Sequence, residues 1–223
     1  MLLDFHTHNR STKANPEALA SYSFSDINTC PTGQLFTFGL HPWDTDTPLI
    51  GNWSETQLLL ELQSPNCMAL GEIGLDRLRG AAIKEQIDIL QQQLDIGKRV
   101  KKPVVLHCVR AWGELRPLLR DFPYPKAIHG FRGNMGVLRS LLAEGWYISV
   151  SGSVLLSSGK RVGSNPPREW LSVIPYDRLL LETDDSGVPI LEVYQAAARY
   201  LECPVEQVLE RAGANIRRFI SCA

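Results

Sequence analysis

The feature that most constrains the fold is an alternation of short apolar runs with amphipathic segments along the 223 residues. About eight of the apolar runs are typical of strands, and most are followed by a segment whose apolar residues recur at helical spacing. Alternating strands and helices over a chain of this length favour a parallel sheet. About eight such pairs favour an α/β fold of the closed (β/α)8 TIM barrel type over an open doubly wound sheet.

The boundaries of the expected elements follow from the same pattern. Strands are predicted in the run before His6 and at 35–40, 67–73, 104–106, 126–128, 147–150 and 178–181, whereas 17–24 fits a strand or a helical turn equally well. Helices are predicted at 54–63, with Ser54 as N-cap, and at 81–100, 112–119, 137–144, 190–201 and 205–219. The stretch 152–161 is interpreted as a βα loop, because its glycine spacing does not fit a phosphate-binding loop. The first strand–helix pairs are short, so we expect the barrel to be distorted or incomplete there, within a single domain covering 1–223.

The composition of the chain limits which binding partners and which cellular compartment we expect for the protein. A net charge of −1 provides no overall positive field that would draw the protein to nucleic acid or to an anionic membrane, so a nucleic-acid substrate would need a local site. Five scattered cysteines without a C-x-x-C pair argue against a disulfide framework and favour a reducing compartment. No signal peptide and no apolar stretch of the ~20 residues needed to span a bilayer is evident. We therefore expect a cytoplasmic protein that does not associate with a membrane and has no obligate protein partner.

The histidines occupy one kind of position in this predicted fold. All five, His6, His8, His41, His107 and His129, lie at or just beyond the C-terminal end of a predicted strand. Glu72 and Asp184 lie in the same kind of position. The active site of a (β/α)8 barrel is built at that face, and residues i and i+2 of a strand, such as His6 and His8, share one face.

Each of these residues also has an ordinary structural explanation. A single histidine near a strand end is more often hydrogen-bonded within the fold, Glu72 could lie on an exposed strand face, and Asp184 could cap a helix. Six of these imidazole and carboxylate groups, all but His41, lie at the ends of five strands and would gather too much unpaired polarity without an ion. Nitrogen and oxygen ligands of this kind suit Zn, Mn or Mg.

Eight motifs carry a resemblance to a known family. They are DFHTH at 4–8, GLHPW at 39–43, GEIGLD at 71–76, PVVLHC at 103–108, IHGFRG at 128–133, YISVSG at 147–152, LLLETD at 179–184 and AGANIRRF at 212–219. In this order, from end to end, they resemble the TatD family of metal-dependent hydrolases, within the amidohydrolase superfamily.

The resemblance implies a centre with two adjacent divalent ions, Zn, Mg or Mn. The implied ligands are His6, His8 and Asp184 for the first ion, His107 and His129 for the second, and Glu72 as a bridge between both. A water activated by the ions would be the nucleophile, and Asp184 is the best candidate to accept its proton. Glu72 and Asp184 are therefore the expected catalytic carboxylates.

Two further residues are implied to contact the substrate. His41 would bind the phosphate of the substrate. An ordinary structural role, as a turn residue before Pro42, explains His41 equally well. Arg110 stands one place later than the arginine of the family's His-x-Arg pattern, and it is the second candidate. The segment between His8 and Gly39 is also short for the family, so part of the substrate-binding rim is expected to differ.

Three functions remain open from the sequence. The first is hydrolysis of phosphoester bonds by a deoxyribonuclease of TatD type, with DNA or a small phosphoester as the substrate. The second is metal-dependent hydrolysis of an amide, lactone or ester; Glu72 argues against it, because related two-metal centres often use a carbamylated lysine as the bridge. The third is a non-catalytic metal-binding relic, which the intact ligand set disfavours.

Overall fold

The structure is a computed structural model that describes residues 3–9, 13, 15–26, 29–156 and 167–221. Eight strands follow one another in the sheet in the order of the sequence. They are β1 (Asp4–Thr7), β2 (Ala18–Tyr22), β3 (Phe36–Phe38), β4 (Cys67–Asp76), β5 (Val104–Val109), β6 (Lys126–Ile128), β7 (Tyr147–Ser151) and β8 (Leu179–Glu182). The segment at 17–24, which the sequence left undecided, therefore contains a strand.

Helices follow most of the strands. They are α1 (Glu55–Leu62), α2 (Ile83–Val100), α3 (Trp112–Leu119), α4 (Met135–Ala143), α5 (Gly152–Leu155), α6 (Pro167–Val173), α7 (Ile190–Leu201) and α8 (Val205–Ile220), with 3-10 helices η1 (Pro42–Asp46) and η2 (Pro48–Asn52). Ser54 caps α1 as predicted, since its hydroxyl accepts a hydrogen bond of 3.3 Å from the backbone N–H of Gln57. In the described parts of the segments that join β1 to β2 and β2 to β3 there is no helix, so these first pairs are short, as expected.

One loop prediction was wrong in part. The first four residues of the stretch 152–161 form α5, whose last N–H bond runs from Leu156 to the carbonyl of Gly152 at 2.9 Å. Residues 157–161 of that stretch lie outside the described residues. Within the described residues, no helix is long and apolar enough to cross a bilayer.

The chain divides into two compact units. Unit 1 contains Met1–Arg10, Pro16–Ala20 and Ala127–Phe219, and unit 2 contains Ser11–Asn15, Ser21–Lys126 and Ile220–Ala223. The expectation of a single domain stays a prediction. Each unit is built on parallel pairing: β3 with β4 and β4 with β5 in unit 2, and β6 with β7 and β7 with β8 in unit 1.

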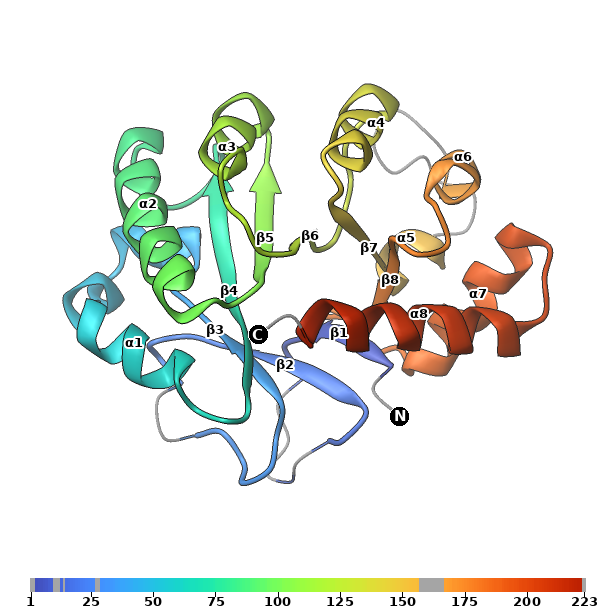
Figure 1. Ribbon diagram of the computed structural model, residues 1–223, viewed down its shortest axis with the longest axis horizontal. Helices are drawn as coiled ribbons and strands as arrows, with labels where there is room; N and C mark the ends of the chain where they lie inside the picture. The colour runs from blue at the N-terminus through green and yellow to red at the C-terminus, as the bar shows by residue number, and fades with distance from the viewer. Residues whose placement is uncertain (1–2, 10–12, 14, 27–28, 157–166, 222–223) are drawn as a thin grey trace. The chain divides into compact units, whose positions relative to one another are not determined.

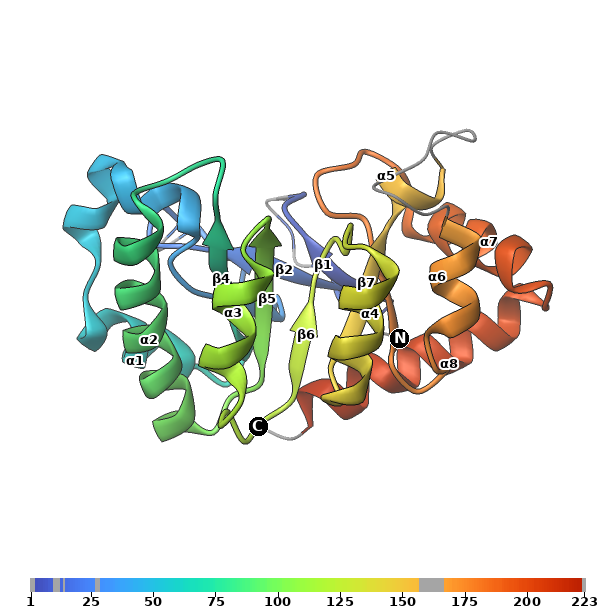
Figure 2. The same cartoon turned by 90° about the horizontal axis from the view of Figure 1, so that it is seen from above.

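In unit 2 the long strand β4 lies between β3 and β5, and α2 packs against it with α1 alongside (Figures 1 and 2). Ile73 of β4 and Leu106 of β5 pair with each other and are fully buried. The next pair is Gly74 and His107, where Gly74 has a φ of +149° and an added Cβ would lie 2.0 Å from the carbonyl oxygen of His107. Only glycine allows the two strands to approach so closely, so Gly74 determines the position of His107 relative to β4.

In unit 1 the closing helices hold the first strand and the last one. The hydroxyl of Tyr194 in α7 donates a 2.9 Å hydrogen bond to the carbonyl of Leu3, and Phe5 of β1 packs edge-on against Phe219 of α8. The amide of Asn215 in α8 donates to the carbonyl of Leu179, which begins β8, at 2.9 Å. Figure 2 shows α4 alongside β7 and α6 alongside α7. The carboxyl ends of β1 and β8 are thereby fixed side by side.

Candidate metal centre

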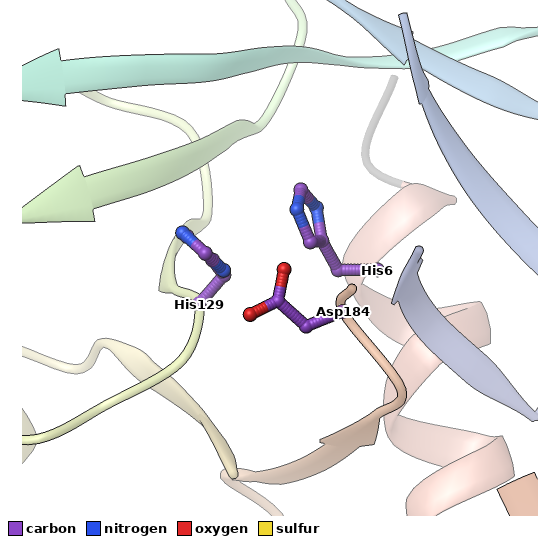
Figure 3. Close-up of side chains that lie close together, drawn as sticks. All are labelled: His6, His129 and Asp184. Atoms are coloured by element: carbon purple, nitrogen blue, oxygen red, sulfur yellow. The ribbon is translucent and has the colours of Figure 1, made fainter. Parts of the chain in front are cut away.

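Unit 1 holds a first cluster of possible metal ligands, formed by His6, His129 and Asp184. His6 lies within β1 and is fully buried, whereas His129 follows β6 and Asp184 follows β8. One ligand atom from each of the three lies within 4.8 Å of the others. Figure 3 shows the Asp184 carboxylate directed toward the two imidazole rings. The three side chains therefore converge from three different strand ends.

The backbone around Asp184 explains this convergence. Its N–H donates to the carbonyl of His6 at 2.9 Å, and the N–H of His8 donates to its carbonyl at 3.3 Å, which forms a parallel bridge between Thr7 and Asp184. Asp184 also has a φ of +54°, in the left-handed region that aspartate and asparagine adopt more readily than most residues. The backbone of Asp184 is therefore held between His6 of β1 and His8, which follows that strand.

His8 extends the first cluster toward solvent. Its Nε2 lies 3.1 Å from Nε2 of His6 and 3.9 Å from Oδ1 of Asp184, and its side chain is 29% exposed. His8, Asp184 and the exposed Asp185 form a second set whose ligand atoms lie within 4.8 Å of one another. The structure thus brings together His6, His8 and Asp184, the three ligands predicted for one ion, and places His129 with His6 and Asp184.

A buried carboxylate, that of Glu182, lies beside the ring of His129. It was not among the residues predicted from the sequence. Glu182 is fully buried, accepts a 2.6 Å hydrogen bond from the N–H of Gly130 and accepts another from the hydroxyl of Ser149. Its Oε1 lies 3.5 Å from Nδ1 of His129. Glu182 stands two residues before Asp184, so the alternation of side chains along a strand was the signal that could have identified it.

A second buried carboxylate belongs to Asp4, the first residue of β1. Asp4 accepts hydrogen bonds from the N–H and the hydroxyl of Thr183, at 2.9 and 2.6 Å. Burial raises the pKa of Asp4 to about 7, although the two bonds from Thr183 act in the opposite direction. These bonds tie β1 to the residue that precedes Asp184, so Asp4 serves the placement of the first cluster.

Unit 2 holds the second cluster, formed by His41, Glu72 and His107. Glu72 of β4 is only 3% exposed, and its Oε1 lies 2.9 Å from Nε2 of His41 and 2.9 Å from Nδ1 of His107 in β5. His41 is fixed as the N-cap of η1, because its Nδ1 accepts a 3.2 Å hydrogen bond from the N–H of Trp43. The sequence placed His41 outside the ligand set, but in the structure it contacts the same carboxylate oxygen as His107.

Asp76 completes the surroundings of His107 and was missed from the sequence. Its Oδ2 lies 3.2 Å from Nε2 of His107 and accepts a 2.6 Å bond from Nε1 of Trp43, while its Oδ1 accepts a 2.7 Å bond from the N–H of Leu78. Burial opposes ionisation of Asp76, but the bonds from His107, Trp43 and Leu78 outweigh it and lower its pKa to about 2. Asp76 lies four residues after Glu72 on one strand, which was the signal for a shared face.

Arg110 is not brought into either cluster by any contact within the described residues. It follows β5, is exposed, and has a left-handed backbone with a φ of +55°. Its role toward a substrate stays a prediction.

The chemistry of the donors fits divalent cations. His107 has a carboxylate oxygen beside each ring nitrogen, and a neutral imidazole has only one N–H to offer. A cation shared with Glu72 would satisfy the other nitrogen. Three nitrogen and oxygen donors in each cluster would also leave positions open on an ion, as catalytic sites require. Cys108 adds no thiolate, because burial raises its pKa to about 12.

Comparison with known proteins gives a family match over most of the chain. The family described as "TatD related DNase" matches residues 7–220. The "3'-5' ssDNA/RNA exonuclease TatD" of Edwardsiella piscicida is 36% identical over 156 residues, 66% of this chain and 56% of that protein. The "Uncharacterized metal-dependent hydrolase YjjV" of Escherichia coli K12 is 30% identical over 155 residues, 68% of this chain and 58% of that protein. The match thus spans a little over half the length of these curated relatives.

Solved structures agree on the fold. The crystal structure of YjjV from Escherichia coli superposes with a TM-score of 0.77 at 22% identity, over 99% of this chain and 98% of that one. A TatD family hydrolase from Entamoeba histolytica gives a TM-score of 0.75 at 17% identity, over 100% and 98%. Together with the strand order β1 to β8, this likeness confirms the predicted (β/α)8 fold class.

Proposed function

Because the chain belongs to the TatD related DNase family, we propose that it is a divalent-metal-dependent hydrolase that cleaves the phosphoester bonds of DNA. The observation that carries this proposal is the convergence of imidazole nitrogens and carboxylate oxygens in the two clusters. The name of the Edwardsiella piscicida relative, an exonuclease acting on single-stranded DNA and RNA, supports phosphoesters over carboxylic esters.

The proposed ligands are the six residues implied by the family motifs. They are His6, His8, Glu72, His107, His129 and Asp184. Divalent ions bound by them would polarise a phosphoryl oxygen and lower the pKa of a water molecule. A bridging role for Glu72 is part of this proposal.

The chain's own residues would orient these groups and move the proton. Asp184 would accept the proton of the attacking water on its carboxylate, which is 24% exposed and therefore accessible. The bond from His41 would orient Glu72 from one side, and Asp76 would hold the ring of His107 from the other. His41 would in addition be within reach of the substrate's phosphate, as the resemblance implies.

The test is release of the terminal nucleotide from a 3′-labelled single-stranded oligonucleotide by metal-free protein reconstituted with Mg, Mn or Zn. Asp184→Asn is the sharpest variant, because asparagine tolerates the left-handed backbone and only the charge is lost. We expect Asp184→Asn and Glu72→Gln to lower the metal-dependent rate by about 100-fold or more. Asp88→Asn, the same exchange on the exposed face of α2, is the matched control and should retain the wild-type rate.

Two results would contradict the proposal. If Asp184→Asn still cleaves the oligonucleotide at the wild-type rate, Asp184 is not the proton acceptor. Metal-dependent hydrolysis of a p-nitrophenyl carboxylic ester without any phosphoester cleavage would instead favour the small-molecule amidohydrolase or esterase.

A further inference from the structure

A partly exposed tryptophan stands beside the second cluster. Trp43 is 37% exposed, yet its indole is fixed, because Nε1 donates a 2.6 Å hydrogen bond to the buried carboxylate of Asp76. The centroid of its ring system lies 4.8 Å from that of His41 and 5.6 Å from that of His107, both edge-on. A rigid aromatic surface is therefore presented to solvent next to the proposed ligands.

A guanidinium group lies on this indole. The central carbon of Arg79 is 4.2 Å from the centroid of Trp43, at the distance of a cation–π contact. Arg79 is exposed, and none of the ion pairs within the described residues involves it. The pair therefore offers two planar groups and one positive charge that pairs with no carboxylate in the part of the chain that the structure describes.

A single buried glutamine shapes the loop that carries Arg79. Gln86 of α2 donates from its amide nitrogen to the carbonyls of Asp76, Arg79 and Ala81, at 2.9, 2.9 and 2.8 Å. Its amide oxygen accepts a 2.8 Å bond from the N–H of Asp76. The backbone on both sides of Arg79 is thus fixed from within the protein.

The same loop is packed directly against η1, the element that begins with Pro42 and Trp43. Gly80 has a φ of +79°, and an added Cβ would lie 2.0 Å from the carbonyl oxygen of Pro42. The N–H of Ala81 donates to the hydroxyl of Thr45 at 2.9 Å. Trp43 and Arg79 are therefore held together before any ligand binds, which lowers the entropic cost of binding to them.

We propose that Trp43 and Arg79 form a nucleotide-binding subsite, in which a base of a single strand stacks on the pair and its phosphate contacts the guanidinium of Arg79. The inference rests on the proposed function and assigns to its substrate two residues outside the proposed ligand set. Unpaired bases expose the faces that stack on aromatic rings and on arginine planes, irrespective of sequence. A small carboxylic ester would use neither the stacking surface nor the free positive charge.

The first test is equilibrium binding without turnover. Full-length protein in EDTA is titrated into a short fluorescein-labelled single-stranded oligonucleotide, and anisotropy is recorded. Arg79→Ala should raise the Kd by on the order of 10-fold. The matched control is Arg77→Ala, which removes the same charge from the same loop but from a side chain already paired with Glu114, and it should change the Kd by less than about 2-fold.

The second test separates stacking from the bond to Asp76. Trp43→Phe keeps an aromatic ring and loses the Nε1 bond, whereas Trp43→Leu loses both. We expect Trp43→Leu to weaken oligonucleotide binding by about 10-fold and Trp43→Phe by clearly less. Equal weakening by the two variants would mean that the indole acts only through Asp76, and would overturn the proposal. Thermal melting of each variant shows that it is folded.

The third test divides the kinetics by substrate. In metal-loaded protein, Arg79→Ala should raise the KM for the oligonucleotide by on the order of 10-fold and should affect methyl p-nitrophenyl phosphate, which has no base, much less. Equal effects on both substrates, or no oligonucleotide binding by the wild type, would overturn the subsite. Binding that depends on Trp43 and Arg79 without any phosphoester cleavage would refute the proposed function alone. Cleavage in which Arg79→Ala behaves like Arg77→Ala would refute the subsite alone.

Discussion

At His107 the two ring nitrogens face different carboxylates, Glu72 at 2.9 Å from Nδ1 and Asp76 at 3.2 Å from Nε2. Asp76 is an ionised neighbour, because hydrogen bonds outweigh its burial and lower its pKa to about 2. We expect its Oδ2 to accept a hydrogen bond from Nε2–H, which would direct Nδ1, with its lone pair, toward Glu72. A carboxylate behind a ligand histidine commonly has this orienting role.

Asp76→Asn tests this role. The amide retains the shape of the side chain but weakens its hold on the N–H of His107, so we expect the affinity for a divalent ion to fall by about 10- to 100-fold. Competition with a fluorescent chelator measures this change, and Asp88→Asn on α2 is again the control. An unchanged affinity would show that His107 needs no orienting partner.

A buried thiol in β4 gives a prediction for alkaline pH. Burial raises the pKa of Cys67 from 9.0 to about 12, so the unfolded chain loses this proton first as the pH rises above 9. Folding stability from this group is thus complete below pH 9 and is lost as the pH rises toward 12, by about 1 kcal/mol at pH 10. Urea unfolding at pH 8 and pH 10 should show a larger loss in the wild type than in Cys67→Ala. Equal losses of unfolding free energy in the two proteins would show that Cys67 does not cause the loss of stability at alkaline pH.

Among the elements, β4 contributes most to the second cluster, since it supplies Glu72 and Asp76 and lies against His107 at Gly74. The close approach at Gly74 leaves no room for a side chain, and its φ of +149° is poorly suited to any other residue. The geometry of the cluster therefore depends on a residue that has no functional group.

Gly74→Ala should destabilise the protein by about 2 kcal/mol or more, because the added methyl group would collide with the carbonyl oxygen of His107. The control is Gly113→Ala in α3, where nothing lies within 4 Å of the added Cβ and where stabilisation by up to about 1 kcal/mol is expected. Urea denaturation compares the two variants. A Gly74→Ala protein as stable as the wild type would show that β4 and β5 can separate without cost.

For the molecule as a whole, the net charge of −1 limits long-range attraction of nucleic acid. Binding should then depend on a few local contacts such as that of Arg79, and the slope of log K against log salt should be only about −1 to −2 for a single strand. Arg79→Ala should reduce the slope by about 0.7, and anisotropy titrations at several salt concentrations measure it. A slope steeper than about −4 would indicate a broad basic surface instead.

The sequence predicted best what depends on local pattern. The helices α3 and α7 begin and end at the predicted residues, because their apolar spacing and flanking residues define them. It could not resolve 17–24, where pairing with β1 decides in favour of a strand. The metal-ligand candidates followed from strand ends and family motifs, but the bond between Trp43 and Asp76 joins residues far apart in the sequence. Such support depends on tertiary packing, which no local pattern records.

The three hydrogen bonds that the amide nitrogen of Gln86 donates have a consequence for how this protein can vary. Surface loops usually accept inserted or deleted residues, because their backbone is satisfied by water. Here one amide group spans the carbonyls of Asp76, Arg79 and Ala81, so a change of a single residue in length would remove at least one of these carbonyls from its donor. The loop between β4 and α2 should therefore be constant in length among functional variants of this chain, even where the identities of its exposed residues change.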